Sequence, residues 1–532
     1  MIRGIDLTNY AYMFEAKGIQ RYIFASGKLR DVVGASDLVA NLASGAGDRI
    51  GELLGKERIK ELFADSPSFS RRAGGAFCVH SVDPKALASL RAEWRYLILR
   101  ELPGLEFVDV IAQSDTSEIE AMRQCFRDAG GIRSNYPAEV PGLGRPITLI
   151  APLTGRPAVA IKQYGTDEVR VDAIGLPQRK QADTDKLDRV AERFVLDVDN
   201  WKFPRNYDEA AEDKDDPKKR NNPLFPFIGD DKRIAVIHAD LSGLGELFRN
   251  MGKAEDFTVE KNFDLAKDIE NAITRAAQDA VACKILPYAN EKKVLPARPV
   301  LLGGDDITII VRADLAIPFT IRLLQNIETE CKSIGEADGH KALSACAGIA
   351  IVGKGTPFLT AYALADDLCR HAKSVVKKPD DELVKINERK GYASAYSFHV
   401  YQHTALDGYE GTIAANDKDA DSKALSANPY IVGARDVKGR ARIDLQTLAQ
   451  KLANVEGGHN RVREIKSLIS DNRALAEVAW ERWWEVGDKK QKDAIGELMA
   501  ALGEADVKDG SSGIFDAMLL IDLGAVTKED AA

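Results

Sequence analysis

The strongest constraint on the fold of this chain is an internal repeat, in which the same motifs occur twice in the same order. The segment YMFEAKGIQRYI aligns without gaps with IHADLSGLGELF, so that Glu15 falls on Asp240 and Gly18 on Gly243. Further along, RRAGGAFCVHSV aligns with VLLGGDDITIIV, and the Gly-Gly pair begins 59 residues after Glu15 and 63 residues after Asp240. Matching motifs at nearly matching spacing predict two related folding units in one chain.

Both copies predict the same order of secondary structure. Each begins with a short apolar run typical of a strand and turns at a glycine into helical sequence. A hairpin at the Gly-Gly pair follows, and then a helix, a strand and a helix. This order is typical of ferredoxin-like, or palm, domains. The expected fold class is α+β, with two ferredoxin-like palm domains and a helical domain near the C-terminal end.

Changes in composition predict where these domains meet. With 532 residues, the chain is long enough for two to four domains. Residues 196–232 are polar, rich in charge and interrupted by prolines, as in a linker or long surface loop. They separate residues 1–195, the predicted first palm with an extension, from residues 233–415, the predicted catalytic palm. Residues 416–532 repeat apolar side chains at helical spacing and predict the C-terminal helical domain.

The composition excludes several classes of protein. A chain with 45% hydrophobic and 29% charged residues is typical of soluble globular proteins, and its net charge of −9 disfavours broad, sequence-independent binding to duplex nucleic acid. No stretch approaches the roughly 20 apolar residues that cross a bilayer, and the first residues lack the apolar core of a signal peptide. The six cysteines form no C-x-x-C pair, which disfavours a disulfide framework or a zinc ribbon. We expect a cytoplasmic protein without a membrane partner.

Three carboxylates of the second copy form the candidate catalytic and metal site: Asp240, Asp305 and Asp306. Side chains opposed on neighbouring strands lie about 5 Å apart at Cβ, close enough to share Mg²⁺. Because side chains alternate along a strand, we expect Asp305 to be the direct ligand and Asp306 a second or orienting ligand. The backbone carbonyl of Leu241 is a further candidate metal ligand. Carboxylates around Mg²⁺ suit the activation of a hydroxyl and the departure of pyrophosphate.

The first copy lacks this set of carboxylates. Ala76 and Phe77 align with Asp305 and Asp306, so Glu15 is the carboxylate that remains. A divalent ion needs several oxygen ligands. The sequence therefore predicts one active palm and one degenerate palm.

Glycines beside the aspartates predict a nucleotide site. The turn at DLSGLG leads into a helix, whose N-terminal N–H groups can hold phosphate oxygens, although a plain turn capped by serine is the alternative. The candidate nucleotide-binding residues of this copy are Leu241, Ser242, Gly243, Gly245, Gly303, Gly304 and Lys373. Lys373 either reaches a β- or γ-phosphate or lies exposed at a helix C-terminus, where the macrodipole favours it. Arg298, before the hairpin, is expected at the surface.

These motifs resemble a known family. Three features are similar to the palm of nucleotidyl cyclases and polymerases. They are the DLSGLG segment at Asp240, the GGDD hairpin, and the Ala-Lys pair near the end of the helix predicted at PFLTAYALADDLCRHAK. FEAKGIQRYIFASGKLRDVVGAS resembles the first palm of the large subunit of type III CRISPR effector complexes. NPYIVGARDVKGRARIDLQTLAQKL resembles the entry to that subunit's C-terminal helical domain.

The resemblance implies an activity. In that family two ATP molecules bind at the junction of the palms, and a ribose hydroxyl of one attacks an α-phosphate of the other. Repetition and closure give cyclic oligoadenylate, a second messenger that activates an effector protein in antiviral defence. Carried onto this chain, the resemblance implies that Asp240, Asp305 and Asp306 hold Mg²⁺ or Mn²⁺. It also implies that Gly18 and Ser36 of the first palm help to seat the acceptor nucleotide.

The chain departs from that family in two ways. It begins at the first palm, without the histidine-aspartate nuclease domain, and it lacks a four-cysteine zinc site. We therefore expect a reduced or standalone relative without DNase activity. The expected function is that of a nucleotidyltransferase, an oligonucleotide cyclase that uses ATP or another NTP and releases pyrophosphate. RNA or CRISPR-type effector subunits and a product-activated effector protein are the expected macromolecular partners.

Two other functions compete with this one. The first is a non-catalytic nucleotide- or RNA-binding scaffold subunit of a CRISPR-like effector complex. Clustered carboxylates repel one another, and an idle site has no need of them, which disfavours the scaffold. The second is a dimeric cyclase of the diguanylate type, which two palms fused in one chain disfavour.

Overall fold

The computed structural model of the chain describes most of its residues. The described residues are 8–26, 28–43, 56–63, 68–73, 75–134, 148–164, 167–182, 189–204, 224–254, 258–303, 306–336, 339–377, 384–386, 389–401, 425–433, 443–502 and 513–526. Contacts divide the chain into two compact units. The first comprises Met1–Arg193, Gly245–Thr274 and Val300–Asp305, and the second comprises Phe194–Leu244, Arg275–Pro299 and Asp306–Ala532.

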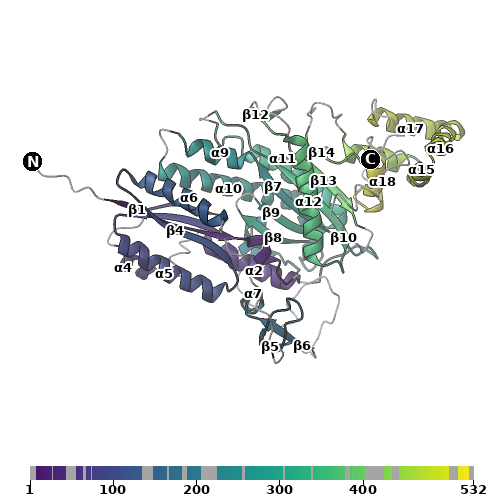
Figure 1. Ribbon diagram of the computed structural model, residues 1–532. Coiled ribbons are helices and arrows are strands. Elements are labelled where there is room, and N and C mark those ends of the chain that lie inside the picture. Colours follow the sequence, from purple (N-terminus) through teal and green to yellow (C-terminus); the bar gives the residue numbers. More distant parts are fainter. Residues whose placement is uncertain are drawn as a thin grey trace, which may run out of the picture. The chain divides into compact units, whose positions relative to one another are not determined.

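An antiparallel four-stranded sheet forms the centre of the first unit, with the strand order β2-β3-β1-β4 (Figure 1). Its strands are β1 (Asn9–Lys17), β2 (Ser68–Ala73), β3 (Ala76–Ser81) and β4 (Glu106–Ser114). The helices of this part of the chain are α1 (Ile19–Ile23), α2 (Leu29–Ala43), α4 (Lys56–Leu62), α5 (Pro84–Glu101), α6 (Glu118–Ser134), α7 (Gly175–Ala182) and α8 (Arg189–Phe194). A separate hairpin consists of β5 (Ala158–Tyr164) and β6 (Asp167–Asp172). The sheet order is that of a ferredoxin-like fold.

The two faces of this sheet are covered by different helices, because successive side chains of a strand point to opposite faces. Phe14 of β1 packs edge-on against Trp94 of α5, with ring centroids 5.6 Å apart. Its neighbour Met13 lies in a buried cluster with Met122 and Cys125 of α6. The alternating apolar pattern of β1 thus buries both faces, and Figure 1 shows α5 and α6 on opposite sides of the sheet.

The second sheet has six strands in the order β14-β13-β10-β7-β9-β8. They are β7 (Arg233–Ser242), β8 (Ala297–Gly303), β9 (Asp306–Arg312), β10 (Ser344–Gly353), β13 (Ala395–Val400) and β14 (Tyr430–Ile431), and β11 (Val384–Ile386) pairs separately with β12 (Arg389–Gly391). The helices in this stretch of sequence are α9 (Leu244–Met251), α10 (Val259–Lys284), α11 (Ala316–Glu330) and α12 (Phe358–Val376). Short 3-10 helices are η1 (Val198–Asn200), η2 (Leu286–Tyr288) and η3 (Ala313–Leu315). The order β10-β7-β9-β8 repeats β4-β1-β3-β2, which confirms the predicted duplication.

Helix α12 passes close to β10 at a glycine. A Cβ atom on Gly348 would lie 1.9 Å from the carbonyl oxygen of Ala365 and 2.5 Å from the amide nitrogen of Cys369. We predict that Gly348→Ala lowers the free energy of unfolding by about 3 kcal/mol, because two backbone segments must separate. Urea denaturation measures this change. Gly353→Ala in the same strand is the matched control, since its Cβ would meet nothing within 4 Å. An equal loss in both variants would contradict the prediction.

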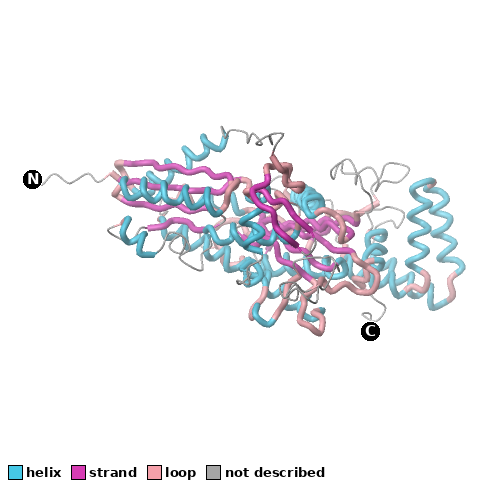
Figure 2. The backbone as a smooth tube through the Cα atoms, turned by 90° about the horizontal axis from the view of Figure 1, so that it is seen from below, coloured by secondary structure: helices cyan, strands magenta, loops and turns pink. Residues whose placement is uncertain are grey.

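Helices dominate the C-terminal part of the chain, as predicted. They are α14 (Leu445–Asn454), α15 (Gly458–Asp471), α16 (Arg473–Val486), α17 (Lys489–Leu502) and α18 (Ile514–Asp522). Figure 2 shows this group of helices in cyan at the right. None of the helices in the described ranges is long and apolar enough to cross a membrane. The proposed boundaries at residues 195, 232 and 415 stay predictions, and residues 205–223 of the linker lie outside the described residues.

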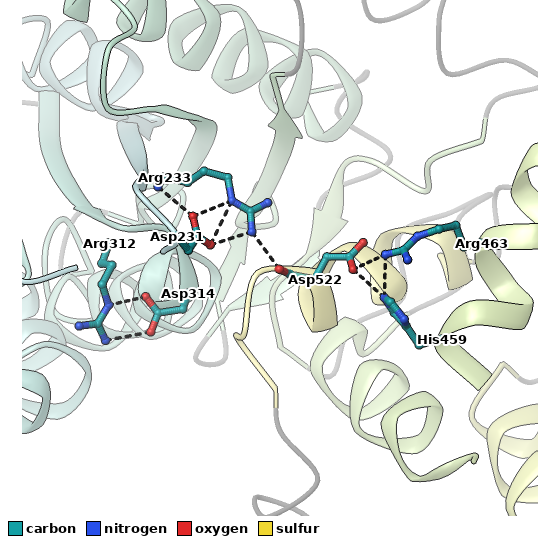
Figure 3. Close-up of polar contacts among 7 residues, drawn as sticks. All are labelled: Asp231, Arg233, Arg312, Asp314, His459, Arg463 and Asp522. Carbon is teal, nitrogen blue, oxygen red and sulfur yellow. Dashed lines mark hydrogen bonds and ion pairs between the residues drawn. The ribbon is translucent and has the colours of Figure 1, made fainter. Parts of the chain in front are cut away.

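The last residue of α18 connects the C-terminal helices to the sheet of the second unit (Figure 3). The Asp522 carbonyl accepts a hydrogen bond of 2.9 Å from Arg233, the first residue of β7. Its carboxylate accepts from Arg463 at 2.5 Å and contacts the Nε2 atom of His459 at 2.6 Å, both in α15. Asp231 pairs with the same Arg233 guanidinium at 2.7 Å. The start of β7 is thus fixed by contacts on both sides of this arginine.

A second connection is buried. The carboxylate of Asp516 in α18 accepts hydrogen bonds from Ser426 Oγ and the Ala427 amide at 2.9 Å, and from the Tyr430 hydroxyl at 2.5 Å. Burial raises the pKa of Asp516. We predict that Asp516→Ala lowers the free energy of unfolding by about 3 kcal/mol, since buried donors lose their acceptor. Urea denaturation tests this against Asp493→Ala, at an exposed position of α17. Losses within about 1 kcal/mol of each other would contradict it.

One surface assignment was wrong. Arg298 in β8 is 1% exposed, and its guanidinium lies 5.9 Å from the centroid of the Phe203 ring. A planar, delocalised cation is favourable over an aromatic face, which allows arginine to enter a core.

All six cysteines carry free thiols, and Cys283 is exposed while the other five are buried.

Candidate functional site

Strands β7 and β9 place two of the predicted aspartates opposite each other. Asp240, near the end of β7, is the register partner of Asp306, the first residue of β9. Directly opposed residues of an antiparallel pair project to the same face, with Cβ atoms about 4.5–5.5 Å apart. Both side chains are partly buried. Two carboxylates therefore share one face of the sheet at the point where β9 begins.

This register differs from the expected one. We expected Asp305 to be the direct ligand, whereas Asp306 is the residue opposite Asp240. Asp305 and Gly304 lie outside the described residues, so the role of Asp305 stays a prediction. Within the ranges that the structure describes, no group of three or more His, Cys, Asp and Glu side chains is placed to hold a metal ion.

The first palm has no carboxylate at the equivalent position. Glu15 of β1 pairs with Ala76, the first residue of β3, as Asp240 pairs with Asp306. The sequence alignment matched Ala76 to Asp305, whereas the strand register makes Ala76 the counterpart of Asp306. The two therefore differ by one residue. The prediction that this palm is a poor metal site does not depend on that offset, because neither Ala76 nor Phe77 offers an oxygen.

A lysine lies against the predicted metal ligands. Lys373, in the last turn of α12, forms an ion pair with the Asp240 carboxylate, and its Nζ atom is 3.3 Å from the carbonyl oxygen of Leu241. Its side chain is only 16% exposed, so it is not at the exposed position of the alternative interpretation. Burial, and then the neighbouring Lys377, lower the pKa of Lys373 to about 7. The Asp240 carboxylate acts against this shift, because an adjacent negative charge favours the ammonium.

This contact tests whether the residues suit a divalent cation. The two oxygens that contact the lysine ammonium belong to Asp240 and Leu241, two of the four metal ligands that the sequence predicted. Carboxylate and carbonyl oxygens are the donors that Mg²⁺ and Mn²⁺ prefer. The donor set therefore fits a hard divalent ion, with Asp306 as the next carboxylate.

A further carboxylate near this site was missed by the sequence analysis. Asp366 of α12 lies 3.8 Å from the Nε2 atom of His238 in β7. Burial raises the pKa of Tyr362, and the charges of Asp306 and Asp366 raise it further, so both carboxylates lie near this ring. Asp366 precedes Lys373 by seven residues, or two helical turns, which places both on one face of α12. This seven-residue spacing is visible in the sequence and could have predicted that Asp366 lies on the same helix face as Lys373.

Two glycines have the same conformational role in the two palms. Gly18 has φ 55° and Gly243 has φ 94°, and each follows the first strand of its palm. A positive φ is costly for residues with a Cβ, so glycine is favoured at both turns. A Cβ on Gly245 or Gly303 would meet nothing within 4 Å, so packing does not require glycine there.

The two predicted serines are buried. Ser242 is 0% exposed in β7, where its register partner is Ser344 of β10. Ser36 of α2 is 1% exposed, and its hydroxyl donates to the carbonyl oxygen of Val300 in β8. The hydroxyl of Ser36 is therefore engaged with a strand. Its predicted part in seating a nucleotide stays a prediction.

The duplication extends to the ion pair at the site. Glu15 is paired with Lys17, at 2.7 Å, and with Arg133 in the last turn of α6. Arg133 and Lys373 each lie fifteen residues after the first residue of their helices, Glu118 and Phe358. Each palm thus pairs an acidic residue of its first strand with a basic residue at one helical position. The second palm adds Asp306 to this pair.

Comparisons with known proteins support this description. Residues 233–380 match the family model described as Cas10/Cmr2, second palm domain. No protein of curated function matches the chain. Csm1 in T.onnurineus is a similar solved structure, with a TM-score of 0.50 and 16% identity, over 98% of this chain and 70% of that one. At this identity the likeness shows the fold alone.

Crystal structures of the Csm1-Csm4 cassette are also similar. The complex with cA4 has a TM-score of 0.48 and 14% identity, and the complex with cA3 has a TM-score of 0.47 and 13% identity. Each covers 97% of this chain and 70% of the other. Residues 233–380 are thus similar to the Cas10/Cmr2 second palm domain, and the strand order of this palm occurs a second time, in the first sheet of the chain.

Proposed function

We propose that the second palm is a metal-dependent nucleotidyltransferase that converts ATP or another NTP into a cyclic oligonucleotide, a second messenger of antiviral defence. One observation carries the proposal. Asp240 and Asp306 are directly opposed on neighbouring strands, beside a carbonyl oxygen that already contacts a cationic side chain. The match of residues 233–380 to the Cas10/Cmr2 second palm supports the same conclusion.

The residues of this palm have distinct proposed roles. Asp240, Asp306 and the Leu241 carbonyl would hold Mg²⁺ or Mn²⁺, together with Asp305. Such an ion, when bound, stabilises negative charge on phosphate oxygens and on the attacking hydroxyl. Lys373 supplies positive charge for the triphosphate. The glycines and serines proposed to contact the two nucleotides are Ser242, Gly243, Gly245, Gly303 and Gly304 in the second palm, and Gly18 and Ser36 in the first.

The proposed reaction joins two nucleotides. The ribose hydroxyl oxygen of one forms a bond to the α-phosphorus of the other and loses its proton. The bond from that phosphorus to the bridging oxygen breaks, and pyrophosphate leaves with both electrons of the bond. A last attack within the linear product closes the ring and releases a further pyrophosphate. This chemistry needs positioning and charge stabilisation, which the carboxylate–metal set and Lys373 provide.

A non-catalytic scaffold is the second candidate function, and one observation favours it. The first palm has the same acid–base pair, Glu15 with Arg133, although Ala76 replaces the hairpin carboxylate. An ion pair at this position therefore exists without a second carboxylate opposite the strand carboxylate. In this alternative the second palm binds nucleotide or RNA within a CRISPR-type effector complex. In the leading proposal, RNA or such subunits activate the enzyme, and its product activates a separate effector protein.

Product analysis separates the two functions. The purified chain is incubated with ATP, GTP, CTP or UTP and with Mg²⁺ or Mn²⁺, and products are identified by mass spectrometry while pyrophosphate is assayed. A cyclic product with matching pyrophosphate release supports the transferase and names its base. Nucleotide binding without any product, in the presence of target RNA and partner subunits as well as in their absence, supports the scaffold.

A further inference from the structure

Strand β8, which leads into the GGDD hairpin, is the outermost strand in the order of its sheet. Such a strand has one neighbouring strand instead of two, so contacts with other elements contribute to holding it. Two of its carbonyl oxygens, on Val300 and Leu302, accept hydrogen bonds from side chains of other elements. Carbonyls two residues apart point to the same edge of a strand, so both donors approach from one side.

The donor to Leu302 is Arg193 of α8. Its Nη1 atom lies 2.8 Å from the Leu302 carbonyl oxygen, and its Nη2 atom forms an ion pair with Glu270 of α10. The side chains of Arg193 and Glu270 are only 18% and 17% exposed. A guanidinium presents several donors in a fixed plane, so Glu270 orients the group that holds Leu302.

The donor to Val300 is Ser36, and the helix that carries it is firmly held. Helix α2 packs against α7 so closely that a Cβ on Gly34 would lie 1.9 Å from the carbonyl oxygen of Gln178. Asp31 of α2 also forms an ion pair of 2.9 Å with Arg179 of α7, with side chains 3% and 6% exposed. Removing one partner of such a buried pair is strongly destabilising. Ser36 is therefore a fixed donor.

Strand β9, which begins with Asp306, lies between β7 and β8 in the strand order. Gly303 ends β8, and Gly304 and Asp305 separate it from Asp306. Glycine has the largest conformational freedom of any residue, and a Cβ on Gly303 would meet nothing within 4 Å. The position of Asp306 therefore depends on the strands beside β9, which are β7, in register with β9 up to the Asp240–Asp306 pair, and β8.

We infer that Arg193 and Ser36 are positioning residues, which hold β8 in place and thereby support the neighbouring strand β9, which begins with Asp306. Val300–Asp305 belong by their contacts to the first unit, as do Ser36 and Arg193, although they lie in the sequence of the second palm. The elements that hold β8 are thus α2, from the first palm, and α8, which precedes the linker. The effect on rate rests on the proposed nucleotidyltransferase, whereas the effect on the strand does not.

Hydrogen–deuterium exchange over residues 297–312 tests the inference without relying on activity. Arg193→Met should speed exchange there by about tenfold, the effect of a lost charged hydrogen bond on local opening. Ser36→Ala, a smaller change, should speed it by about threefold. Arg193→Lys should restore part of the protection, because lysine keeps the charge and can still donate. Arg275→Met is the matched control, since it removes another arginine–glutamate pair of α10, with Glu330.

Two comparisons complete the test. Glu270→Gln should speed exchange less than Arg193→Met, because Arg193 can still donate its hydrogen bond to the Leu302 carbonyl oxygen. In the product assay, Arg193→Met should lower kcat by about tenfold and change the KM for NTP by less than about twofold, as expected for a misplaced carboxylate.

Hydrogen–deuterium exchange over residues 297–312 decides whether Arg193 and Ser36 hold β8. Exchange over residues 297–312 that is equal in Arg193→Met and Arg275→Met would overturn it. If Arg193→Met does not fold, unchanged exchange in Ser36→Ala overturns it. If the wild-type chain makes no product while Arg193→Met still loses protection, the proposed catalysis is contradicted. The inference that Arg193 holds β8 is then still supported.

Discussion

Asp306→Asn should reduce formation of the cyclic product by about a thousandfold or more, because it removes the charge of a proposed metal ligand opposite Asp240. Asparagine has nearly the same size and shape as aspartate but lacks the charge that balances a divalent ion. Asp240→Asn should have an effect of the same order. Mass spectrometry of the products and an assay of released pyrophosphate measure both losses. Binding of Mn²⁺, measured by calorimetry, should weaken in parallel.

The first palm supplies the control. Glu15 is the counterpart of Asp240 in the degenerate copy, where it pairs with Lys17 and Arg133. Glu15→Gln is expected to leave product formation within about threefold of the wild type, since a surface ion pair contributes little. All variants should keep a cooperative thermal unfolding transition. Activity that survives Asp306→Asn, or falls equally in Glu15→Gln, would contradict the assignment of the second palm as the active copy.

The sequence was informative where one pattern determines both fold and site. Glycine followed by a helix, and Gly-Gly followed by an apolar run, occur in both copies and predicted the duplicated topology. They also predicted that the strand with Asp240 adjoins the hairpin. They did not predict the register, because the two hairpins differ by one residue in their pairing: Glu15 faces Ala76, whereas Asp240 faces Asp306. Such an offset depends on the turn, whose backbone conformation glycine leaves open.

Long-range contacts explain what the sequence could not predict. Ser36 contacts a strand 264 residues further along the chain, and Arg193 contacts Leu302 across 109 residues. No local sequence pattern predicts such long-range contacts. Ser36 was therefore predicted near a nucleotide, and no role was predicted for Arg193. Arg298 was predicted at the surface because arginine usually lies there, yet it is buried beside Phe203. Asp366 is different, because its helical spacing from Lys373 was visible in the sequence.

Lys373→Met is expected to change metal binding and catalysis in opposite directions. In the structure the Lys373 ammonium contacts Asp240 and Leu241, the oxygens proposed for the metal. Removing this cation leaves the Asp240 charge unbalanced, so the affinity for Mn²⁺ without nucleotide should rise about tenfold. Product formation should fall about a hundredfold, because the proposed triphosphate site loses a positive charge. Calorimetry measures the first effect, and mass spectrometry measures the second.

Lys377→Met separates this contact from a general change in charge. Lys377 follows α12, is exposed, and lies near the ring of Tyr392. Its removal takes away the same charge one turn further on, so metal affinity and product formation should each stay within about twofold of the wild type. The first palm shows that an arginine at this helical position can pair with the strand carboxylate in the absence of a hairpin aspartate. If Lys373→Met alters stability alone, with metal affinity and product formation unchanged, its pair with Asp240 is such a structural pair. Opposite changes in metal affinity and product formation would instead show that the second palm has adapted an inherited ion pair to its site.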